Sequence, residues 1–371
     1  MCTLLPCSFY GIRRAHYDLF LVTHIGLSIV VLWTMYYHVE IFTGGEYSVF
    51  IWPCVAIWIL DRIFRLGRMI AFNRNPLSTK AWVSYNADSN LVKMEIDSSK
   101  NLLPPSPGAY YYIHVLDDLL YAHQSHPFTL AFLSSDLSPL YNASTSPVVS
   151  SPRPQPTSSA LGRVSSESAA LLAASSESAS NMVFLIRPYD GFTSRLKLHC
   201  LLNPKKLSVL VDGPYGQTIP LHTFSNILFI VGGTGITVLS SHLSRLLSSS
   251  PHVQKVKVVW AVREHAFLRS VLHHLAGSLQ DERLEMAIHV TRDGEAKEDV
   301  LGEEAGNVRI HSRRPNVRTV VQNAAQEAGE QGLAIVCCGP ALMADLTRKA
   351  SVEMLGNGHH GIEYFEESFK W

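Results

Sequence analysis

The sequence lacks several features that would assign it to common classes of protein. Its 31 lysines and arginines balance 31 aspartates and glutamates, so it has no basic excess for binding a polyanion, and we predict no nucleic-acid partner. The cysteines form no C-x-x-C pair and show no zinc-ligand spacing, which argues against a disulfide scaffold or a structural zinc site. Charged residues make up only 17% of the chain and mean hydropathy is +0.10. These values fit either an ordinary soluble protein or a soluble body that carries a membrane segment.

The N-terminal part of the chain is the part poorest in charge. Residues 19–39 form a run of 21 residues without Asp, Glu, Lys or Arg. As a helix this run would span about 31 Å, the thickness of a bilayer core. A second uncharged run covers the 14 residues 47–60 and contains aromatic residues typical of a membrane interface. We therefore predict a partial transmembrane helical domain with two spans over residues 1–75. The alternative is two core helices of a soluble protein.

Basic residues flank these two runs on their outer sides only. Arg13 and Arg14 precede the first run and Arg62 and Arg65 follow the second, whereas the turn between them has no Lys or Arg. Cytoplasmic flanks of membrane spans are enriched in Lys and Arg. We therefore expect an integral membrane protein whose remaining domains are cytosolic.

Residues 80–222 have the pattern of an antiparallel β-barrel. β-branched and aromatic runs bounded by Pro, Gly, Asn or Ser occur at 82–85, 91–96, 109–115 and 182–186. Residues 134–180 interrupt this pattern with 16 Ser and 5 Pro in 47 residues. Their apolar residues are too few and too small to offset chain entropy, so we predict a disordered insertion.

Residues 223–371 alternate between strand and helix patterns. Strands are predicted at 227–231, 256–262, 286–290 and 334–338, and helices at 237–248, 264–276, 316–330 and 340–355. This alternation predicts an α/β domain with a parallel, doubly wound sheet. Ligands on such sheets bind at the carboxyl ends of the strands.

Two motifs follow strands of this predicted sheet. The segment Gly232-Gly-Thr-Gly235 comes between a strand and a helix, where a glycine backbone and free helix N–H groups suit a pyrophosphate. The alternative is a tight turn without a ligand. The segment Cys338-Gly-Pro340 ends another strand, and its cysteine is either beside a bound nicotinamide or simply buried.

Two further segments are candidates for cofactor contacts. Arg263 ends the strand after the glycine-loop helix, where an arginine can hold the 2′-phosphate of NADPH; the alternative is a surface ion pair with Glu264 or Asp281. The segment His126-Pro-Phe-Thr129 is an apolar, turn-like insertion after a barrel strand; the alternative is simply a strand end. Its Thr129 hydroxyl can hydrogen-bond a flavin ring nitrogen.

His24 and His38 lie on the first apolar run, 14 residues apart. In a helix this separation amounts to about 1400° of rotation and about 21 Å of rise, so both face the same side. Two imidazoles at this spacing suit two haems stacked across a bilayer. The alternative is two histidines near the membrane interfaces.

In combination these segments resemble the fungal ferric/cupric-chelate reductases, relatives of the NADPH oxidases. The resemblance also rests on the segments Tyr17-Asp-Leu-Phe20, Trp58-Ile-Leu-Asp-Arg62, Pro107-Gly108, Gly191-Phe-Thr193, Asp212-Gly-Pro-Tyr-Gly216 and the C-terminal Tyr364-Phe-Glu-Glu-Ser-Phe-Lys-Trp371. It implies a haem-bearing transmembrane domain fused to a cytosolic domain like ferredoxin–NADP reductase. Residues 1–75 would be the part of the haem-bearing domain that this sequence contains. Residues 80–222 would bind FAD and residues 223–371 would bind NADPH.

The resemblance also implies an activity and a set of site residues. NADPH would reduce FAD, and electrons would pass through haem to a ferric or cupric chelate outside the plasma membrane. The implied FAD contacts are His126, Pro127, Phe128, Thr129, Gly191, Phe192 and Thr193. The implied NADPH contacts are Gly232, Gly233, Thr234, Gly235, Arg263, Cys338, Gly339 and Pro340. Phe369 or Trp371 would cover the flavin. Thr129, Cys338 and Trp371 are the implied catalytic residues, and His24 and His38 the implied metal ligands.

The chain departs from the family in its histidines. Family members carry two pairs of haem-ligating histidines on two helices, whereas this sequence shows one pair. A truncated gene model, a short paralogue and a subunit that uses a partner's helices all remain open. The functional alternatives are a superoxide-generating oxidase and a truncated NADPH diaphorase or non-catalytic partner without haem.

Overall fold

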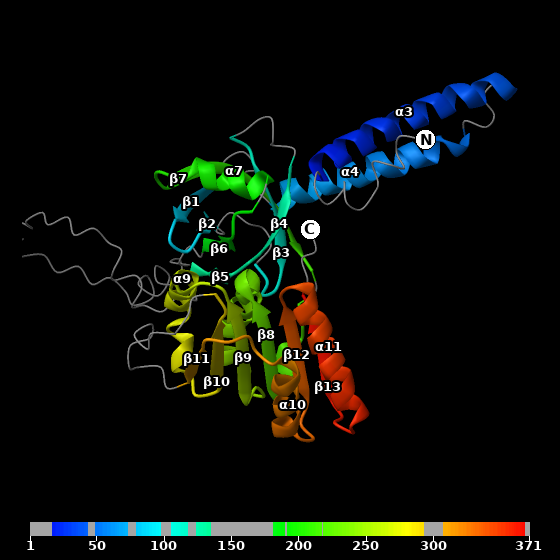
Figure 1. The fold of residues 1–371 in the computed structure, drawn as a ribbon. Coiled ribbons are helices and arrows are strands. Elements are labelled where there is room, and N and C mark those ends of the chain that lie inside the picture. The colour runs from blue at the N-terminus through cyan, green and yellow to red at the C-terminus, as the bar shows by residue number, and fades with distance from the viewer. Residues whose placement is uncertain are drawn as a thin grey trace, which may run out of the picture.

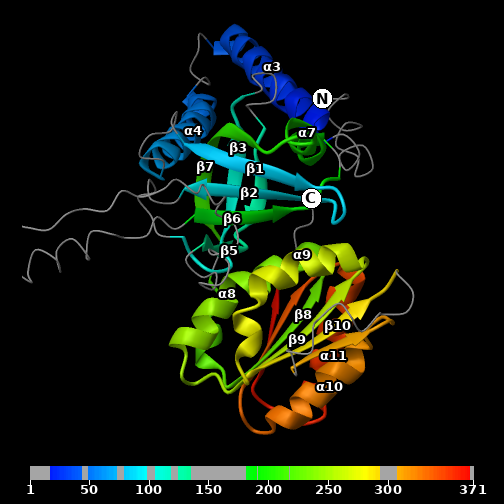
Figure 2. The same cartoon turned by 90° about the vertical axis from the view of Figure 1, so that its left-hand side faces the viewer.

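The computed structural model describes residues 17–43, 49–72, 79–97, 105–117, 124–134, 181–189, 191–216, 218–292 and 307–367. These residues form two N-terminal helices, an antiparallel lobe and a parallel α/β lobe (Figure 1). Both helices lie at the far side of the antiparallel lobe from the parallel sheet (Figure 2). Most of the predicted insertion, residues 135–180, and the predicted flavin-covering residues Phe369 and Trp371 lie outside the described residues.

The N-terminal helices are α3 (Tyr17–Thr43) and α4 (Trp52–Phe72). In the described part of the chain, one helix is long and apolar enough to cross a membrane, over Phe20–Ile41 of α3. Helix α4 instead carries Asp61 and several arginines in its second half, and some of these arginines pair with the antiparallel lobe. The second predicted span is therefore not confirmed.

The antiparallel lobe is a curled seven-stranded sheet in the order β4-β3-β7-β1-β2-β6-β5. Its strands are β1 (Lys80–Asn86), β2 (Leu91–Asp97), β3 (Tyr110–Val115), β4 (His126–Thr129), β5 (Phe132–Leu133), β6 (Asn181–Ile186) and β7 (Lys205–Tyr215). Helix α7 (Gly191–His199) covers one end. Alternate side chains such as Tyr111, Phe184 and Met94 are buried inside the curl. The four predicted strand runs are confirmed, but the predicted turn at 126–129 is strand β4.

The parallel lobe is a six-stranded sheet in the order β11-β10-β9-β8-β12-β13. The strands are β8 (Asn226–Gly232), β9 (Lys255–Val262), β10 (Leu284–Val290), β11 (Val308–His311), β12 (Leu333–Cys338) and β13 (Ile362–Glu366). The helices are α8 (Ile236–Ser249), α9 (His265–Leu275), α10 (Val317–Ala328) and α11 (Ala341–Gly356). The predicted parallel sheet is thus confirmed, with two further edge strands, β11 and β13.

Side chains that alternate along β8 explain how the helices cover the sheet. Phe229 and Val231 point into a core shared with α8 and α9, whereas Leu228 and Ile230 pack with α10 and α11. Because successive strand residues point to opposite faces, a continuous apolar strand requires helices on both sides. Helices α8 and α9 lie on the side that faces the antiparallel lobe (Figure 2).

The two ends of the predicted insertion emerge at neighbouring points of the antiparallel lobe. Strand β5 pairs with β6, and the backbone N–H of Asn181 donates to Ser134 Oγ at 2.7 Å. A short connection can therefore join the two strands without disturbing their register.

We predict that deleting residues 136–178 leaves NADPH-dependent dye reduction within about twofold of the intact chain, because loop length has a small energetic cost. Steady-state assays and thermal unfolding of both proteins check this. A large loss of activity at unchanged stability would show that the insertion takes part in function.

Candidate functional site

The two motifs predicted to bind NADPH lie against each other at the carboxyl edge of the parallel sheet. Strand β8 ends at Gly232, and a 3₁₀ turn over Gly233–Gly235 leads into α8. Strand β12 pairs directly with β8, with Cys338 opposite Val231. A Cβ atom on Gly235 would lie 2.3 Å from the Cys338 carbonyl oxygen and 3.0 Å from its Sγ atom. Only glycine allows this close approach.

The glycine loop itself leaves room for a ligand. Gly233 has φ +56°, and a Cβ atom there would meet nothing within 4 Å. The Trp260 indole N–H of β9 donates to the Gly233 carbonyl at 3.0 Å, and this hydrogen bond fixes the loop to the neighbouring strand. The loop opens helix α8, whose first N–H groups and dipole favour an anion. The residues present therefore fit a pyrophosphate, and its binding here stays a prediction.

Cys338 is buried at the junction of the two loops. Burial raises the pKa of its thiol to about 12, and the nearby Glu367 carboxylate adds to this effect. The side chain is therefore a neutral thiol at physiological pH and does not act as a thiolate nucleophile. Its position at the carboxyl edge agrees with a packing role beside a planar ligand.

Arg263 follows β9 at the same edge of the sheet and is exposed. Neither of its predicted alternative partners binds it. The Glu264 carboxylate pairs with Arg187 at 3.3 Å and Arg292 at 3.5 Å, and the Asp281 carboxylate pairs with Arg283 at 2.7 Å. Among the described residues, the predicted ion pair of Arg263 with Glu264 or Asp281 is therefore not formed.

The two motifs predicted to bind FAD also lie together, on the antiparallel lobe. The His126 ring of β4 stacks on the Phe192 ring of α7 with centroids 4.6 Å apart, and the Phe128 ring lies 6.0 Å from Phe192. The Tyr189 N–H donates to Thr193 Oγ1 at 2.9 Å, which orders the approach to α7. Gly191, with φ +52° and open space at its Cβ position, begins the helix. A helix N-terminus of this kind suits the FAD pyrophosphate.

The predicted haem ligands lie on the first N-terminal helix. His24 and His38 are both exposed on α3. Helix α4 contains no histidine. A six-coordinate haem of the predicted kind needs a second axial histidine for each iron. The described helices supply one ligand at each level, so they do not complete a haem site.

The seam between the two lobes brings Gly108, quoted above only for the family resemblance, against residues of α8 that were not singled out from the sequence. The Gly108 N–H donates to Ser241 Oγ of α8 at 3.0 Å, and a Cβ atom on Gly108 would lie 2.6 Å from His242 Nε2. Gly108 also has φ +73°. The Arg187 guanidinium, next to β6, joins Glu264 at the start of α9. These contacts fix the orientation of one lobe on the other.

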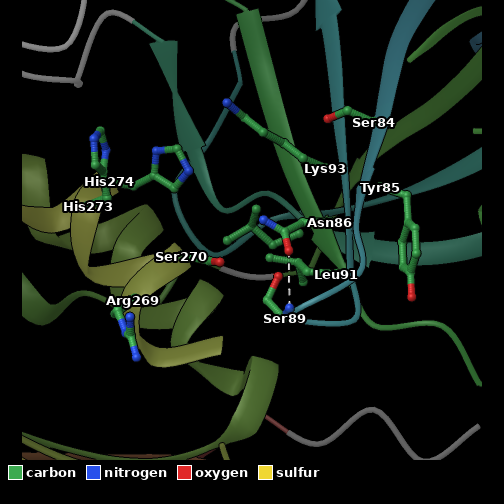
Figure 3. Close-up of a pocket in the computed structure, with 11 residues that line it drawn as sticks. Ser84, Tyr85, Asn86, Ser89, Leu91, Lys93, Arg269, Ser270, His273 and His274 are labelled. Carbon is green, nitrogen blue, oxygen red and sulfur yellow. Dashed lines mark hydrogen bonds between the residues drawn. The ribbon is translucent and has the colours of Figure 1, made fainter. Parts of the chain in front are cut away.

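A pocket of about 600 Å³ opens at another part of this seam (Figure 3). It lies between the β1–β2 hairpin and helix α9, and Lys93, Arg269, His273 and His274 are among its lining residues. None of the predicted cofactor-binding residues lines it. We therefore assign it to the packing of the lobes and not to the cofactor site.

Two seam histidines make stability sensitive to acid. Burial lowers the pKa values of His242 and His274 to about 4, with smaller contributions from nearby positive groups. Because both are neutral when folded but gain a proton near pH 6.5 when unfolded, stability is complete above pH 6.5 and is lost as the pH falls toward 4.

We predict that the free energy of unfolding falls by roughly 2 kcal/mol for each of these histidines between pH 7 and pH 5. Urea unfolding at the two pH values measures the change. In the variant carrying His242→Gln and His274→Gln the pH dependence should be much weaker. An equally steep dependence in that variant would assign acid sensitivity to other groups.

Comparisons with known proteins agree with the two lobes. Residues 224–352 match the family model of the ferric reductase NAD binding domain, and residues 77–139 match that of an FAD-binding domain. The chain is 27% identical over 392 residues to ferric reductase transmembrane component 6 of Saccharomyces cerevisiae, covering 100% of this chain and 48% of that protein. It is 26% identical over 403 residues to ferric/cupric reductase transmembrane component 2 of the same yeast, covering 100% and 49%.

The chain thus spans about half the length of these relatives. Among solved structures, the CS-b5R domains of human Ncb5or in the NAD+ form are similar in fold, with a TM-score of 0.50 and 16% identity over 77% of this chain and 68% of that chain. This likeness is one of fold: a curled antiparallel sheet beside a parallel α/β sheet, the ferredoxin-reductase-like arrangement.

Proposed function

We propose that this chain, a relative of the fungal ferric and cupric reductases, transfers electrons from NADPH through FAD toward a ferric or cupric chelate. The observation that carries the proposal is that the four predicted cofactor motifs form two pairs, one on each lobe. His126 stacks on Phe192 in one pair, and Gly235 packs against Cys338 in the other. The related reductases and the two matched domains support the same conclusion.

Each lobe has a distinct task in this mechanism. The segment Gly232–Gly235 and the start of α8 would hold the NADPH pyrophosphate through backbone N–H groups, and Arg263 would hold the 2′-phosphate. Cys338, Gly339 and Pro340 would shape the space beside the nicotinamide. The tight backbone contact of Gly235 with Cys338 keeps these two loops in a fixed relation, so the ligand is oriented when it binds.

The antiparallel lobe would hold the flavin. His126, Pro127, Phe128 and Thr129 would surround the ring, with the Thr129 hydroxyl at a ring nitrogen, and Gly191, Phe192 and Thr193 would hold the pyrophosphate. When bound, FAD accepts two electrons from NADPH and releases them one at a time, which is the chemistry a metal chelate needs. The neutral Cys338 thiol adds no charge at the nicotinamide position.

The N-terminal helices are proposed to attach the two lobes to a membrane. The candidate span in α3 and the transmembrane relatives support membrane association. We propose that the protein lies in the plasma membrane, with lipid around α3 and both lobes in the cytosol. We also propose three domains, over residues 1–75, 80–222 and 223–371. The described N-terminal helices do not complete a haem site, so the proposal ends at the flavin and assigns no step to haem.

Purified full-length chain in detergent tests the proposal. We expect visible flavin absorbance after reconstitution with FAD, NADPH-dependent reduction of ferricyanide or ferric citrate, and a preference for NADPH over NADH that Arg263→Gln removes. Thr129→Val should keep NADPH binding while weakening flavin reduction. Absence of bound flavin after reconstitution would support a non-catalytic partner, and superoxide as the main product would support an oxidase.

A further inference from the structure

Helix α4 is fixed to the antiparallel lobe by a buried carboxylate. Asp212 on β7 is fully buried, with 0% of its side chain exposed. Its oxygens are shared by two arginines of α4: Arg65 Nε lies 3.3 Å from Oδ2 and Arg68 Nη2 lies 3.1 Å from Oδ1. The Tyr215 hydroxyl also donates to Oδ2 at 2.8 Å. A buried charge is stable only when it is paired and hydrogen-bonded in this way.

The same arginines lie over tyrosine rings of the lobe. The Arg65 guanidinium carbon lies 5.5 Å from the centroid of Tyr112, and that of Arg68 lies 4.0 Å from the centroid of Tyr215. Tyr110 stacks on Tyr215 with centroids 5.6 Å apart. Planar guanidinium groups held between a carboxylate and aromatic faces have little freedom to move. Helix α4 is therefore held in direction as well as in position.

This cluster continues directly into the strand predicted to hold the flavin. Tyr112 on β3 is opposite Asp212 on β7 and opposite Pro127 on β4. Tyr110 is likewise opposite Tyr215 on one side and Thr129 on the other. Strand β3 thus lies between the arginine contacts on β7 and the His126–Thr129 segment of β4, and links the two across three neighbouring strands.

We propose that Asp212, Arg65 and Arg68 form a docking joint that sets the position of the N-terminal helices relative to the flavin lobe. This role rests on the proposed function, because its value lies in holding the flavin at a fixed distance from the membrane side, where the electrons leave. These three are positioning residues. The contacts described above join them to each other and to Tyr112 and Tyr215, and to none of the four predicted cofactor motifs. They act through strand β3.

A distance measurement tests the joint without using either cofactor. Cys54 is exposed on α4, and Leu202 is 90% exposed on the antiparallel lobe after α7. Spin labels on Cys54 and on the Leu202→Cys variant, with Cys2→Ser and Cys7→Ser to avoid extra labels, report how α4 sits on the lobe. Pulsed electron–electron double resonance on the full chain gives the distribution of distances between the two spin labels.

The variant Arg65→Gln/Arg68→Gln should widen this distribution at least about twofold, because the helix loses both ion pairs with Asp212 and both guanidinium contacts with the tyrosine rings. Asp212→Asn should widen it as well. Arg62→Gln is the matched control: Arg62 is on the same helix but pairs with its neighbour Asp61, so the distribution should stay narrow. Narrow distributions in both joint variants would overturn the proposal.

Dye reduction on the same samples separates the joint from the proposed function. NADPH-dependent ferricyanide reduction should stay within about twofold of the unsubstituted chain in Arg65→Gln/Arg68→Gln, because a small dye takes electrons at the flavin itself. The unfolding midpoint of that variant should fall, because the buried Asp212 carboxylate loses both of its charged partners, so all samples are compared at a temperature below that midpoint. Loss of bound flavin in this variant would overturn the joint and assign the cluster to the flavin site. Absence of activity in every sample, with widened distances, would leave the joint standing and refute the proposed function.

Discussion

Replacing Gly235 with alanine is expected to lower kcat/KM for NADPH by about 100-fold or more, while FAD stays bound. The new Cβ atom would lie 2.3 Å from the Cys338 carbonyl oxygen, 3.0 Å from its carbonyl carbon and 3.0 Å from its Sγ atom. Two of these three atoms belong to the backbone of a central strand, which cannot move without breaking its pairing with β8. The glycine loop must therefore shift away from the position that suits a pyrophosphate.

Steady-state kinetics with ferricyanide and flavin absorbance of the purified variant check this result. Gly356→Ala is a matched control, because Gly356 ends α11 and a Cβ atom there meets nothing within 4 Å. The control should behave like the unsubstituted chain. A Gly235→Ala protein with normal kcat/KM would mean that the loop does not bind the nucleotide.

Replacing Gly108 with alanine is expected to slow flavin reduction by about 10- to 100-fold with little change in the affinity for either cofactor, since misplacement by about 1 Å is costly in hydride transfer. The Cβ atom would lie 2.6 Å from His242 Nε2, and Gly108 donates to Ser241 Oγ across the seam. Either the buried His242 ring or the antiparallel lobe must then shift, and we expect the lobe to move because the ring is packed on all sides. Stopped-flow measurement of flavin bleaching by NADPH gives the rate.

Two comparisons separate this steric effect from backbone strain. Gly329→Ala places alanine at a similar positive φ of +58° with open space around it, so it should cost about 1–2 kcal/mol of stability and leave the rate unchanged. Adding His242→Ala to Gly108→Ala removes the clashing ring and should recover part of the rate. If the double variant were as slow as Gly108→Ala, lobe docking through this contact would not explain the loss.

The parallel sheet was the most predictable part of the fold. Its central strands are continuous apolar runs, such as Ile227–Val231, and the helices between them have the amphipathic period of surface helices. The edge strands β11 and β13 escaped prediction because half-exposed residues give them no apolar run. Pro127 gives the segment 126–129 the pattern of a turn, but β4 is at the edge of its sheet, and an edge strand accepts a proline.

The candidate site was predictable where a local motif carries the chemistry. The glycine loop and the Cys338 segment follow strands in sequence, and neighbouring parallel strands bring their carboxyl ends together. The seam and the docking joint were not predictable in this way. Gly108 meets His242 and Asp212 meets Arg68 through contacts between segments more than 100 residues apart, and no local pattern records such a pairing.

The second predicted span is not confirmed, for a related reason. The uncharged run 47–60 is genuine, but helix α4 continues through Asp61, Arg65 and Arg68 to Phe72. Its charged half faces a carboxylate that the chain supplies much later, at Asp212. If only the uncharged residues before Asp61 are considered, the apolar half of this helix has the composition of a short membrane segment.

The central claim is that this chain brings NADPH and FAD together for electron transfer. Anaerobic mixing of the FAD-reconstituted full chain with NADPH tests it most directly. We predict that the flavin absorbance band bleaches in a single turnover and that one equivalent of NADPH suffices for each flavin. A chain that binds FAD fully yet keeps its oxidised flavin spectrum in excess NADPH would contradict the account.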